Sequence, residues 1–235
     1  MKSKKPANSP TILNYKTILV ICYGRSGSTL LQGILNSIDS VLVKGENNNI
    51  FYHFYCGYRE LLANSKRFNN SVSPTHPWFG SCWFNEDEFM HDFRKLARSV
   101  LASNRKTDAH RFTTLGFKEI RYPRLENPVP YIEFLISVFD TPCIIHLTRN
   151  HYATALSQSK KLKNKKSVSI AEIVTELERF DEQMKPLSTR PYYFHIDYEE
   201  MVSPDRRALT ELFEFLGADY NDNAVNWVMS IPHSY

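Results

Sequence analysis

Short apolar runs that alternate with segments of helical character restrict the fold of this sequence more than any other feature. Several runs are apolar at nearly every position, which is typical of strands covered on both faces in a parallel sheet. The alternation predicts an α/β fold in which helices flank a central parallel sheet and the functional site lies at the carboxyl ends of the strands. The predicted strands are Thr17–Tyr23, Ser40–Val43, Thr114–Lys118, Cys143–Leu147 and Tyr192–Ile196.

Helix start signals occur in the segments between these runs. Asn85 and Ser169 each precede a glutamate by three residues, which is the spacing of a capping box. Ser203 is followed by a proline, a pattern typical of an N-cap and a first helical turn. The predicted helices are Thr29–Ile38, Asn85–Ser103, Val129–Phe139, His151–Leu162, Ser169–Met184 and Pro204–Leu216.

Length and composition indicate a single globular domain. The chain has 235 residues, of which 42% are hydrophobic and 23% are charged, close to the averages for soluble proteins. The net charge of +4 is too small to indicate a dedicated nucleic-acid binder, but it is compatible with an anionic ligand. We expect a flexible basic tail over residues 1–15 and one domain over residues 16–235.

Cysteine usage and hydropathy indicate the cellular compartment of the protein. The four cysteines are widely spaced and form no CxxC pair, which argues against a zinc knuckle or a disulfide scaffold. No apolar run approaches the ~20 residues of a transmembrane helix, and the N-terminal residues lack the apolar stretch of a signal peptide. We therefore expect a soluble, cytoplasmic protein without an integral membrane segment.

Aromatic residues concentrate between Ile50 and Phe84, where 10 of the 31 in the chain fall within 35 residues. One interpretation is a satellite core beneath a long loop. The other is an insertion that forms one wall of an acceptor pocket, since ligand pockets are mostly apolar and aromatic. Under the second interpretation Tyr52, His53 and Trp78 are candidate contacts of the acceptor.

The strongest local motif joins the first predicted strand to the first predicted helix. A strand, a turn of small residues and a helix in this order aim several backbone N–H groups at one point, with the helix dipole behind them. A nucleotide-triphosphatase loop has a lysine, which neutralises the terminal phosphates, at the position that Ser28 occupies here. The motif therefore predicts a site for a phosphate-like anion other than ATP. Its residues are Gly24, Arg25, Ser26, Gly27, Ser28 and Thr29.

Residues 22–31, with the sequence CYGRSGSTLL, resemble the 5′-phosphosulfate loop of sulfotransferases that use 3′-phosphoadenosine 5′-phosphosulfate (PAPS). The form RSGST is typical of the carbohydrate-type and bacterial branches of that family, whereas the cytosolic branch usually has a lysine in place of Arg25. The family marks its 3′-phosphate site by a strand-end arginine and a serine eight residues later, and Arg149 and Ser157 have that spacing here. Residues 196–217 also resemble the late strand–helix segment of the family.

The resemblance implies a P-loop-like sulfotransferase fold and an enzyme that transfers a sulfuryl group from PAPS to a hydroxyl, or an amine, of a small-molecule or carbohydrate acceptor. The residues of the loop would bind the phosphosulfate, and Arg149 with Ser157 would bind the 3′-phosphate. Arg25 and Lys118 would stabilise the group in transfer, without a metal ion. Natural-product or carbohydrate sulfation is the expected role, with no nucleic-acid partner and with the oligomeric state left open.

The resemblance also implies a general base. In the carbohydrate-type branch the usual base is a glutamate just after the second strand, which is Glu46 in this chain. The cytosolic branch uses a histidine instead, and Ile120 occupies that position here, which favours Glu46. His53 is a weaker candidate for the base, since a lone histidine is more often structural.

Two questions stay open at the level of the sequence. The lysine run after Ser157 is either a solvated loop or a lid that attracts an anionic donor. Two other classes of function are a P-loop-type nucleotide-dependent kinase, which would need magnesium and ATP, and a non-catalytic nucleotide-binding protein. The run comprises Lys160, Lys161, Lys163, Lys165 and Lys166.

Overall fold

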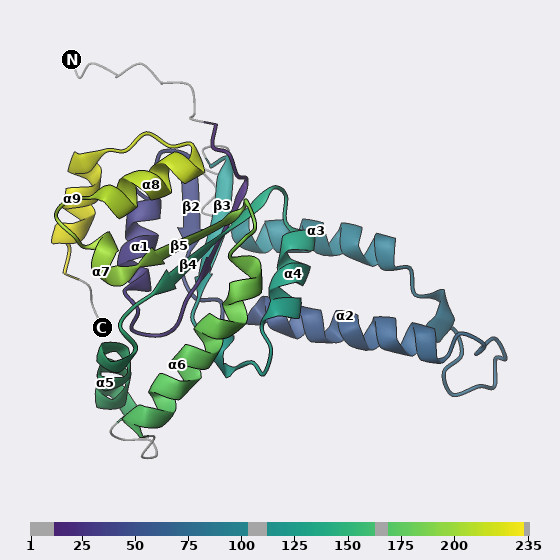
Figure 1. The fold of residues 1–235 in the computed structure, drawn as a ribbon. Helices are drawn as coiled ribbons and strands as arrows, with labels where there is room; N and C mark the ends of the chain where they lie inside the picture. The colour runs from purple at the N-terminus through teal and green to yellow at the C-terminus, as the bar shows by residue number, and fades with distance from the viewer. Residues whose placement is uncertain (1–11, 103–111, 163–168, 233–235) are drawn as a thin grey trace.

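A five-stranded parallel sheet lies at the centre of the structure, a computed structural model that describes residues 12–102, 112–162 and 169–232 (Figure 1). The strands stand in the order β2-β3-β1-β4-β5, and every neighbouring pair is parallel. The predicted α/β class is confirmed, and each predicted strand is present to within two residues at either end. The strands are β1 (Thr17–Ile21), β2 (Val41–Lys44), β3 (Thr114–Glu119), β4 (Pro142–Thr148) and β5 (Tyr193–Asp197).

Helices cover both faces of the sheet, as expected for strands that are apolar at almost every position. In β1, Leu19 and Ile21 belong to the core that packs against α2, α3, α4 and α6. Ile18 and Val20 belong to the core that packs against α1, α8 and α9. The helices are α1 (Ser28–Leu35), α2 (Ile50–Arg67), α3 (Glu86–Ala102), α4 (Val129–Val138), α5 (His151–Leu162), α6 (Ile170–Met184), α7 (Tyr198–Met201), α8 (Arg207–Leu216) and α9 (Asp222–Ser230), with short 3₁₀ helices η1 (Ser81–Trp83), η2 (Tyr122–Arg124) and η3 (Lys185–Leu187).

The helix start signals had different outcomes. Ser169 and Glu172 form the predicted capping box, in which each side chain bonds the other residue's backbone N–H. The prediction of a helix from Pro204 is wrong, because α8 begins at Arg207. Residues 203–206 instead form a turn, in which the backbone N–H of Arg206 donates to the carbonyl oxygen of Ser203 and Arg206 has a φ of 56°. Helices α2, α7 and α9 were not predicted.

Helices α2 and α3 extend away from the sheet as an arm, with residues 68–84 at its far end (Figure 1). The prediction of a long loop is wrong for residues 50–67, which form the 18 residues of α2. Phe51 and Tyr55, at the base of the arm, are buried in the core that also contains Leu19 and Ile21 of β1, so these two aromatic residues do not form the predicted satellite core. Tyr55 packs there against Tyr131 of α4, with ring centroids 5.6 Å apart.

Some predictions fall on residues that the structure does not describe. Most of the predicted tail, residues 1–11, and Lys163, Lys165 and Lys166 of the lysine run lie outside the described ranges. Across the described ranges, no helix combines the length and the apolar character needed to cross a membrane.

Candidate functional site

The predicted phosphate-binding loop lies at the carboxyl end of β1, the central strand of the sheet. Gly27 immediately precedes α1 and has a φ of 89°, a left-handed conformation that favours glycine. The first N–H groups of α1, at Ser28 and Thr29, have no carbonyl partner within the helix and are available to an anion. Burial raises the pKa of the Cys22 thiol, just before the loop, to about 12, so this thiol is not a nucleophile at neutral pH.

The structure brings the loop and the second predicted motif into direct contact. Arg25 Nε donates a hydrogen bond to Ser157 Oγ over 2.9 Å, although the two residues are 132 positions apart. A guanidinium nitrogen of Arg149 donates to the carbonyl oxygen of Arg25 over 3.0 Å. Two cationic side chains and one hydroxyl therefore meet close to the start of α1.

Neighbouring side chains hold Arg149 and the loop in place. The hydroxyl of Tyr23 donates to the carbonyl oxygen of Arg149 and accepts from its backbone N–H, at 2.9 and 2.8 Å. The side-chain amide of Gln158 donates to the carbonyl oxygen of Gly24 over 2.7 Å. The guanidinium carbon of Arg149 lies 4.3 Å from the ring centroid of Tyr198. The same ring covers the loop, because a Cβ added to Gly27 would lie 2.2 Å from it.

The candidate base and Lys118 form an ion pair on the other side of the loop. Glu46 follows β2, and its carboxylate lies 3.2 Å from Lys118 Nζ at the end of β3 and 3.5 Å from a guanidinium nitrogen of Arg121. Arg121 also pairs with the fully buried carboxylate of Glu119 at 2.6 Å. Glu119 accepts in addition from the backbone N–H groups of Asn49 and Ile120, at 2.9 and 2.8 Å.

This charged group lies at the same edge of the sheet as the predicted phosphate-binding loop. β1 and β3 are paired so that Val20 lies beside Lys118 and Ile21 beside Glu119. Beyond the strands, Tyr23 and Arg121 form a further antiparallel backbone bridge. The carboxylate predicted as the base, the lysine and the loop therefore meet at the carboxyl ends of three neighbouring strands.

The candidate contacts of the acceptor do not all lie together. Tyr52 and His53 are in the first turn of α2, close in sequence to Glu46, and Tyr52 packs against Tyr131 with ring centroids 5.3 Å apart. Trp78 lies beyond the opposite end of α2, and 18 helical residues rise roughly 27 Å. The structure therefore places Trp78 at the far end of the arm, apart from the other two (Figure 1).

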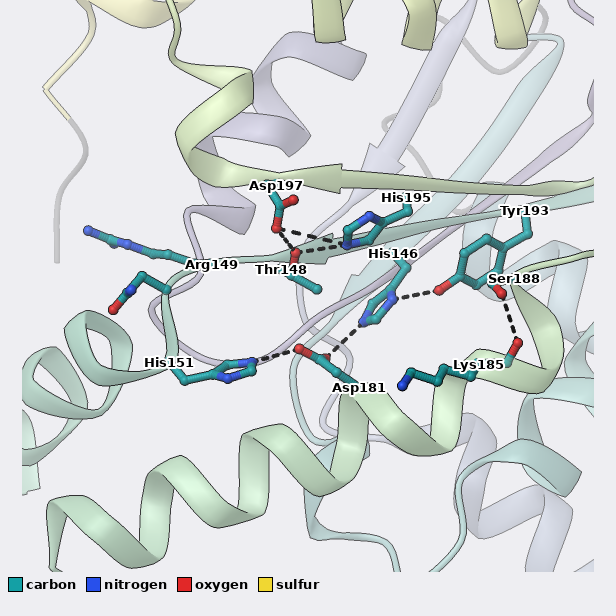
Figure 2. A pocket seen from close by; sticks show the side chains of 11 residues that line it. His146, Thr148, Arg149, His151, Asp181, Lys185, Ser188, Tyr193, His195 and Asp197 are labelled. Carbon is teal, nitrogen blue, oxygen red and sulfur yellow. Dashed lines mark hydrogen bonds and ion pairs between the residues drawn. The ribbon is translucent and has the colours of Figure 1, made fainter.

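A polar cavity of about 540 Å³ lies next to Arg149, between β4, β5 and α6 (Figure 2). His146 and His195 are register partners in β4 and β5. The ring of His146 meets Phe180 of α6 edge to face, so the cavity is on the face of the sheet opposite α1. Figure 2 shows Arg149 directed away from the histidines, so Arg149 lies at the edge of the cavity, between it and the cluster around Arg25.

Hydrogen bonds and ion-pair contacts in this cavity link four elements of the fold. Asp181 of α6 contacts His151 Nε2 at 2.7 Å and His146 Nε2 at 3.3 Å, and His146 Nδ1 lies 2.6 Å from the Tyr193 hydroxyl. Burial lowers the pKa of His146, against the opposing effect of Asp181. In the described part of the chain no group of His, Cys, Asp and Glu side chains is arranged to hold a metal ion. The contacts brace the end of β4 from which Arg149 projects.

Sequence reasoning missed two contributors to the site. Tyr198 follows β5 directly, and its position over Gly27 and Arg149 depends on how α7 and α1 pack. Arg121 lies two residues beyond β3, and its link between Glu119 and Glu46 depends on a three-dimensional meeting of two loops. A signal for Arg121 was present in the charges of residues 118–121, where a lysine and a glutamate end a buried strand and an arginine follows two residues later.

Comparisons with known proteins bear on the family and the fold of this chain. A family model described as the sulfotransferase family matches residues 17–222. The sulfotransferase domain of the Synechococcus PCC 7002 olefin synthase is 18% identical with a TM-score of 0.57, and the match covers 97% of this chain and 82% of that one. The sulfotransferase domain of the curacin biosynthetic pathway is 15% identical with a TM-score of 0.56, covering 89% and 76% of the two chains.

A further solved structure, mouse sulfotransferase SULT7A1 complexed with PAP, is 16% identical with a TM-score of 0.48, and the match covers 92% of this chain and 62% of that one. Among the curated proteins no sequence matches. At these identities the two sulfotransferase domains described first establish the fold alone, and the family model covers most of the chain, including both predicted anion-binding motifs.

Proposed function

This chain belongs to the sulfotransferase family, and we propose that it transfers a sulfuryl group from PAPS to a hydroxyl or an amine of a small-molecule or carbohydrate acceptor. The observation that carries the proposal is the contact between the two motifs, in which Arg25 bonds Ser157 and Arg149 bonds the backbone of Arg25. A donor with a 5′-phosphosulfate and a 3′-phosphate has two anionic ends, and this cluster offers a cation for each.

The residues fit this donor in charge and in hydrogen-bonding capacity. Gly24 to Thr29 would hold the phosphosulfate through backbone N–H groups and hydroxyls at the start of α1. Arg149 and Ser157 would hold the 3′-phosphate, where a guanidinium suits a phosphate in fork geometry. Arg25 and Lys118 would stabilise the negative charge that develops on the transferring group and on the leaving phosphate. When bound, PAPS supplies the sulfuryl group together with 3′-phosphoadenosine 5′-phosphate (PAP) as the leaving group.

Glu46 would take the proton of the acceptor. As the acceptor oxygen or nitrogen forms its bond to sulfur, its proton passes to the Glu46 carboxylate, and the bond between sulfur and the 5′-phosphate oxygen breaks. Lys118 lies 3.2 Å from that carboxylate, so one lysine can contact both the base and the transferring group. Tyr52 and His53 are proposed to line the acceptor side, whereas Trp78 is left out because the arm places it far from them.

Ligand-dependent melting tests the donor. PAP at a hundred times its dissociation constant should stabilise the protein by about 2.7 kcal/mol, which corresponds to a rise in melting temperature of roughly 5–11 °C for a domain of this size. Arg149→Ala should remove most of that rise, and Arg207→Ala, at an exposed position of α8, should not. Stabilisation by ATP with magnesium but not by PAP would contradict the proposal and favour the kinase.

Sulfuryl transfer from labelled PAPS to a panel of sugars, phenols, lipids and guanidine-bearing metabolites tests the reaction. Once an acceptor is found, Glu46→Gln should lower kcat by about 10²–10⁴-fold, the usual contribution of a general base. The same variant should keep the melting shift with PAP, since Glu46 is not assigned to the donor. Glu60→Gln, at an exposed position of α2, is the matched control and should retain full activity. Unchanged turnover in Glu46→Gln would remove Glu46 from its role.

A further inference from the structure

The far end of the arm carries a cluster of exposed apolar side chains that neither core of the protein covers. Its members, which we call the arm tip, are Val72, Trp78, Phe79 and Trp83, with 65%, 44%, 43% and 64% of their surface exposed. Two of the three tryptophans in the chain are among them. Exposed apolar side chains gathered at one place on a polar protein mark a surface that another molecule covers.

The arm tip is a structured surface. The rings of Phe79 and Trp83 pack edge to face, with centroids 4.9 Å apart. The backbone N–H of Gly80 donates to the carbonyl oxygen of Ser71 over 3.3 Å, and Ser71 is 4% exposed. Gly80 has a φ of 82°, which lets the chain turn back at this point. Because the loop is closed by its own contacts, the aromatic side chains are presented in a defined arrangement before any partner binds.

Clusters of opposite charge border the arm tip on its two sides. Lys66 and Arg67 end α2, whereas Glu86, Asp87 and Glu88 begin α3. Figure 1 shows these two helix ends on the two neighbouring helices of the arm, where the segment that joins α2 and α3 begins and ends. All five side chains are exposed. Glu86 accepts a hydrogen bond from the hydroxyl of Tyr58.

The charges at the rim are largely unused within the chain. Within the residues that the structure describes, the side chains of Lys66, Asp87 and Glu88 form no ion pair. Arg67 packs over the ring of Phe68, with its guanidinium carbon 5.2 Å from the centroid. The surface therefore consists of an apolar centre with a basic rim on one side and an acidic rim on the other.

Such a surface is complementary to itself under a two-fold rotation. In a two-fold contact, every pair of touching residues occurs twice, once with each copy supplying each member of the pair. The basic rim of each copy therefore faces the acidic rim of the other. The apolar centres of both copies are buried in the same step. An anionic membrane suits this surface less well, since three carboxylates border the same aromatic side chains.

We propose that the arm tip is an interface with a second copy of this chain, formed by two arms that meet end to end around a two-fold axis. The proposal goes beyond sulfuryl transfer and does not depend on it. The interface pairs Lys66 and Arg67 of one copy with the acidic start of α3 in the other, around a shared centre of Trp78, Phe79 and Trp83.

Mass measurements on the full chain test the proposal. Sedimentation velocity or light scattering after gel filtration should show a dimer whose population rises with protein concentration. Replacing the apolar centre with Phe79→Ser and Trp83→Ser should raise the dimer dissociation constant at least tenfold. Trp227→Ser is the matched control, because Trp227 of α9 is 66% exposed but lies elsewhere, and it should dimerise like the wild type.

A charge exchange makes the test specific for the two-fold arrangement. One variant carries Lys66→Glu with Arg67→Glu, and a second carries Asp87→Lys with Glu88→Lys. Each alone should be monomeric, because like charges then face each other at both rims. An equimolar mixture should form a heterodimer, because both rims are then complementary. Circular dichroism and melting temperatures should confirm that both variants fold.

Three results would overturn the proposal. The first is a wild type that stays monomeric at 100 µM, and the second is a dimer that persists in the Phe79→Ser, Trp83→Ser variant. The third is failure of the two folded charge variants to associate when mixed. Vesicles of phosphatidylcholine with phosphatidylserine test the alternative partner, an anionic lipid surface. If a monomeric wild type bound these vesicles through the arm tip, the partner of the arm tip would be a lipid surface and not a second copy of the chain.

Discussion

Two features of the structure disfavour a side chain at position 27, where the chain has a glycine. Its φ of 89° is left-handed, and an added Cβ would lie 2.2 Å from the ring of Tyr198. A left-handed residue with a Cβ costs about 1–2 kcal/mol, and overpacking costs about 1–3 kcal/mol more. Gly27→Ala should therefore lower the free energy of unfolding by about 2–5 kcal/mol, as measured by chemical denaturation.

A double-mutant cycle separates the two costs. In a Tyr198→Ala background the clash is absent, so Gly27→Ala should cost only the conformational part, about 1–2 kcal/mol. Gly57 is the control, because it lies inside α2 and an added Cβ there meets no atom within 4 Å. Gly57→Ala should stabilise the protein by about 0.5–1 kcal/mol. Equal effects at Gly27 and Gly57 would contradict the close packing of Tyr198 on the loop.

His146 makes the stability of the protein sensitive to acid. Burial lowers the pKa of His146 from its usual 6.5, and His195 acts in the same direction, whereas Asp181 and Asp197 oppose them. Below pH 6.5 the unfolded state takes up a proton that the folded state does not, so the free energy of unfolding falls as the pH is lowered. The loss from this group is at most about 1.4 kcal/mol per pH unit.

Melting curves between pH 7.5 and pH 5.5 measure this effect. His146→Gln removes the titrating group, so its melting temperature should fall less than that of the wild type over this range. Its absolute stability at pH 7.5 should be lower, because the bonds to Tyr193 and Asp181 are weakened. Identical pH dependence in the two proteins would show that burial of His146 does not control the acid response.

At the scale of elements, Glu119 connects the end of β3 to the start of α2. Its carboxylate is fully buried and accepts from Asn49, Ile120 and Arg121. Glu119→Gln replaces one acceptor oxygen with an NH₂ group that faces the N–H donors, so one of these donors loses its acceptor. This loss should cost about 1–3 kcal/mol in the free energy of unfolding. It should also lower kcat, because Arg121 then loses the anion that holds it beside Glu46.

Glu133→Gln is the control for that substitution, since Glu133 is exposed on α4. It should change stability by no more than about 0.5 kcal/mol and leave turnover unaltered. Parallel denaturation curves and initial rates for the two variants provide the comparison. If Glu119→Gln behaved like Glu133→Gln, the buried carboxylate would not organise the loop that carries Glu46.

The elements that sequence reasoning predicted well are those whose signal is local. β1 is apolar along its whole length and is followed at once by a turn of small residues, so strand, loop and helix could each be predicted from a few neighbouring positions. Helix α2 lacked such a signal, because its N-cap, Asn49, is left-handed and makes no side-chain cap bond. Its aromatic residues then indicated a loop or a pocket wall in place of a helix.

The same distinction applies to the candidate site. The loop and the eight-residue spacing of Arg149 and Ser157 could be read from the sequence, and the structure joins them through Arg25. The position of Trp78 could not, because it depends on the direction and length of α2. The link from Glu119 through Arg121 to Glu46 could not either, since it requires the loops after β2 and β3 to meet.

At the scale of the whole molecule, hydrogen exchange should respond to the donor at the carboxyl edge of the sheet but not along the arm. The predicted phosphate-binding loop, the end of β3 and the segment from Arg149 to Gln158 meet at the carboxyl ends of the strands. The distal half of α2 lies away from this edge (Figure 1). A ligand that binds at the edge should therefore slow hydrogen exchange at its contacts without changing exchange along the arm.

Hydrogen exchange followed by mass spectrometry gives the measurement. PAP should slow exchange in peptides covering residues 22–31 and 147–158 at least tenfold, because backbone N–H groups there become bonded to the ligand or lose access to water. Peptides covering residues 60–67 should exchange at the same rate with and without PAP, at a protein concentration held constant so that self-association does not change. ATP with magnesium should give weaker protection at 147–158, since ATP lacks the 3′-phosphate assigned to Arg149. Protection by PAP along the arm but not at residues 22–31 would place the anion site elsewhere in the molecule.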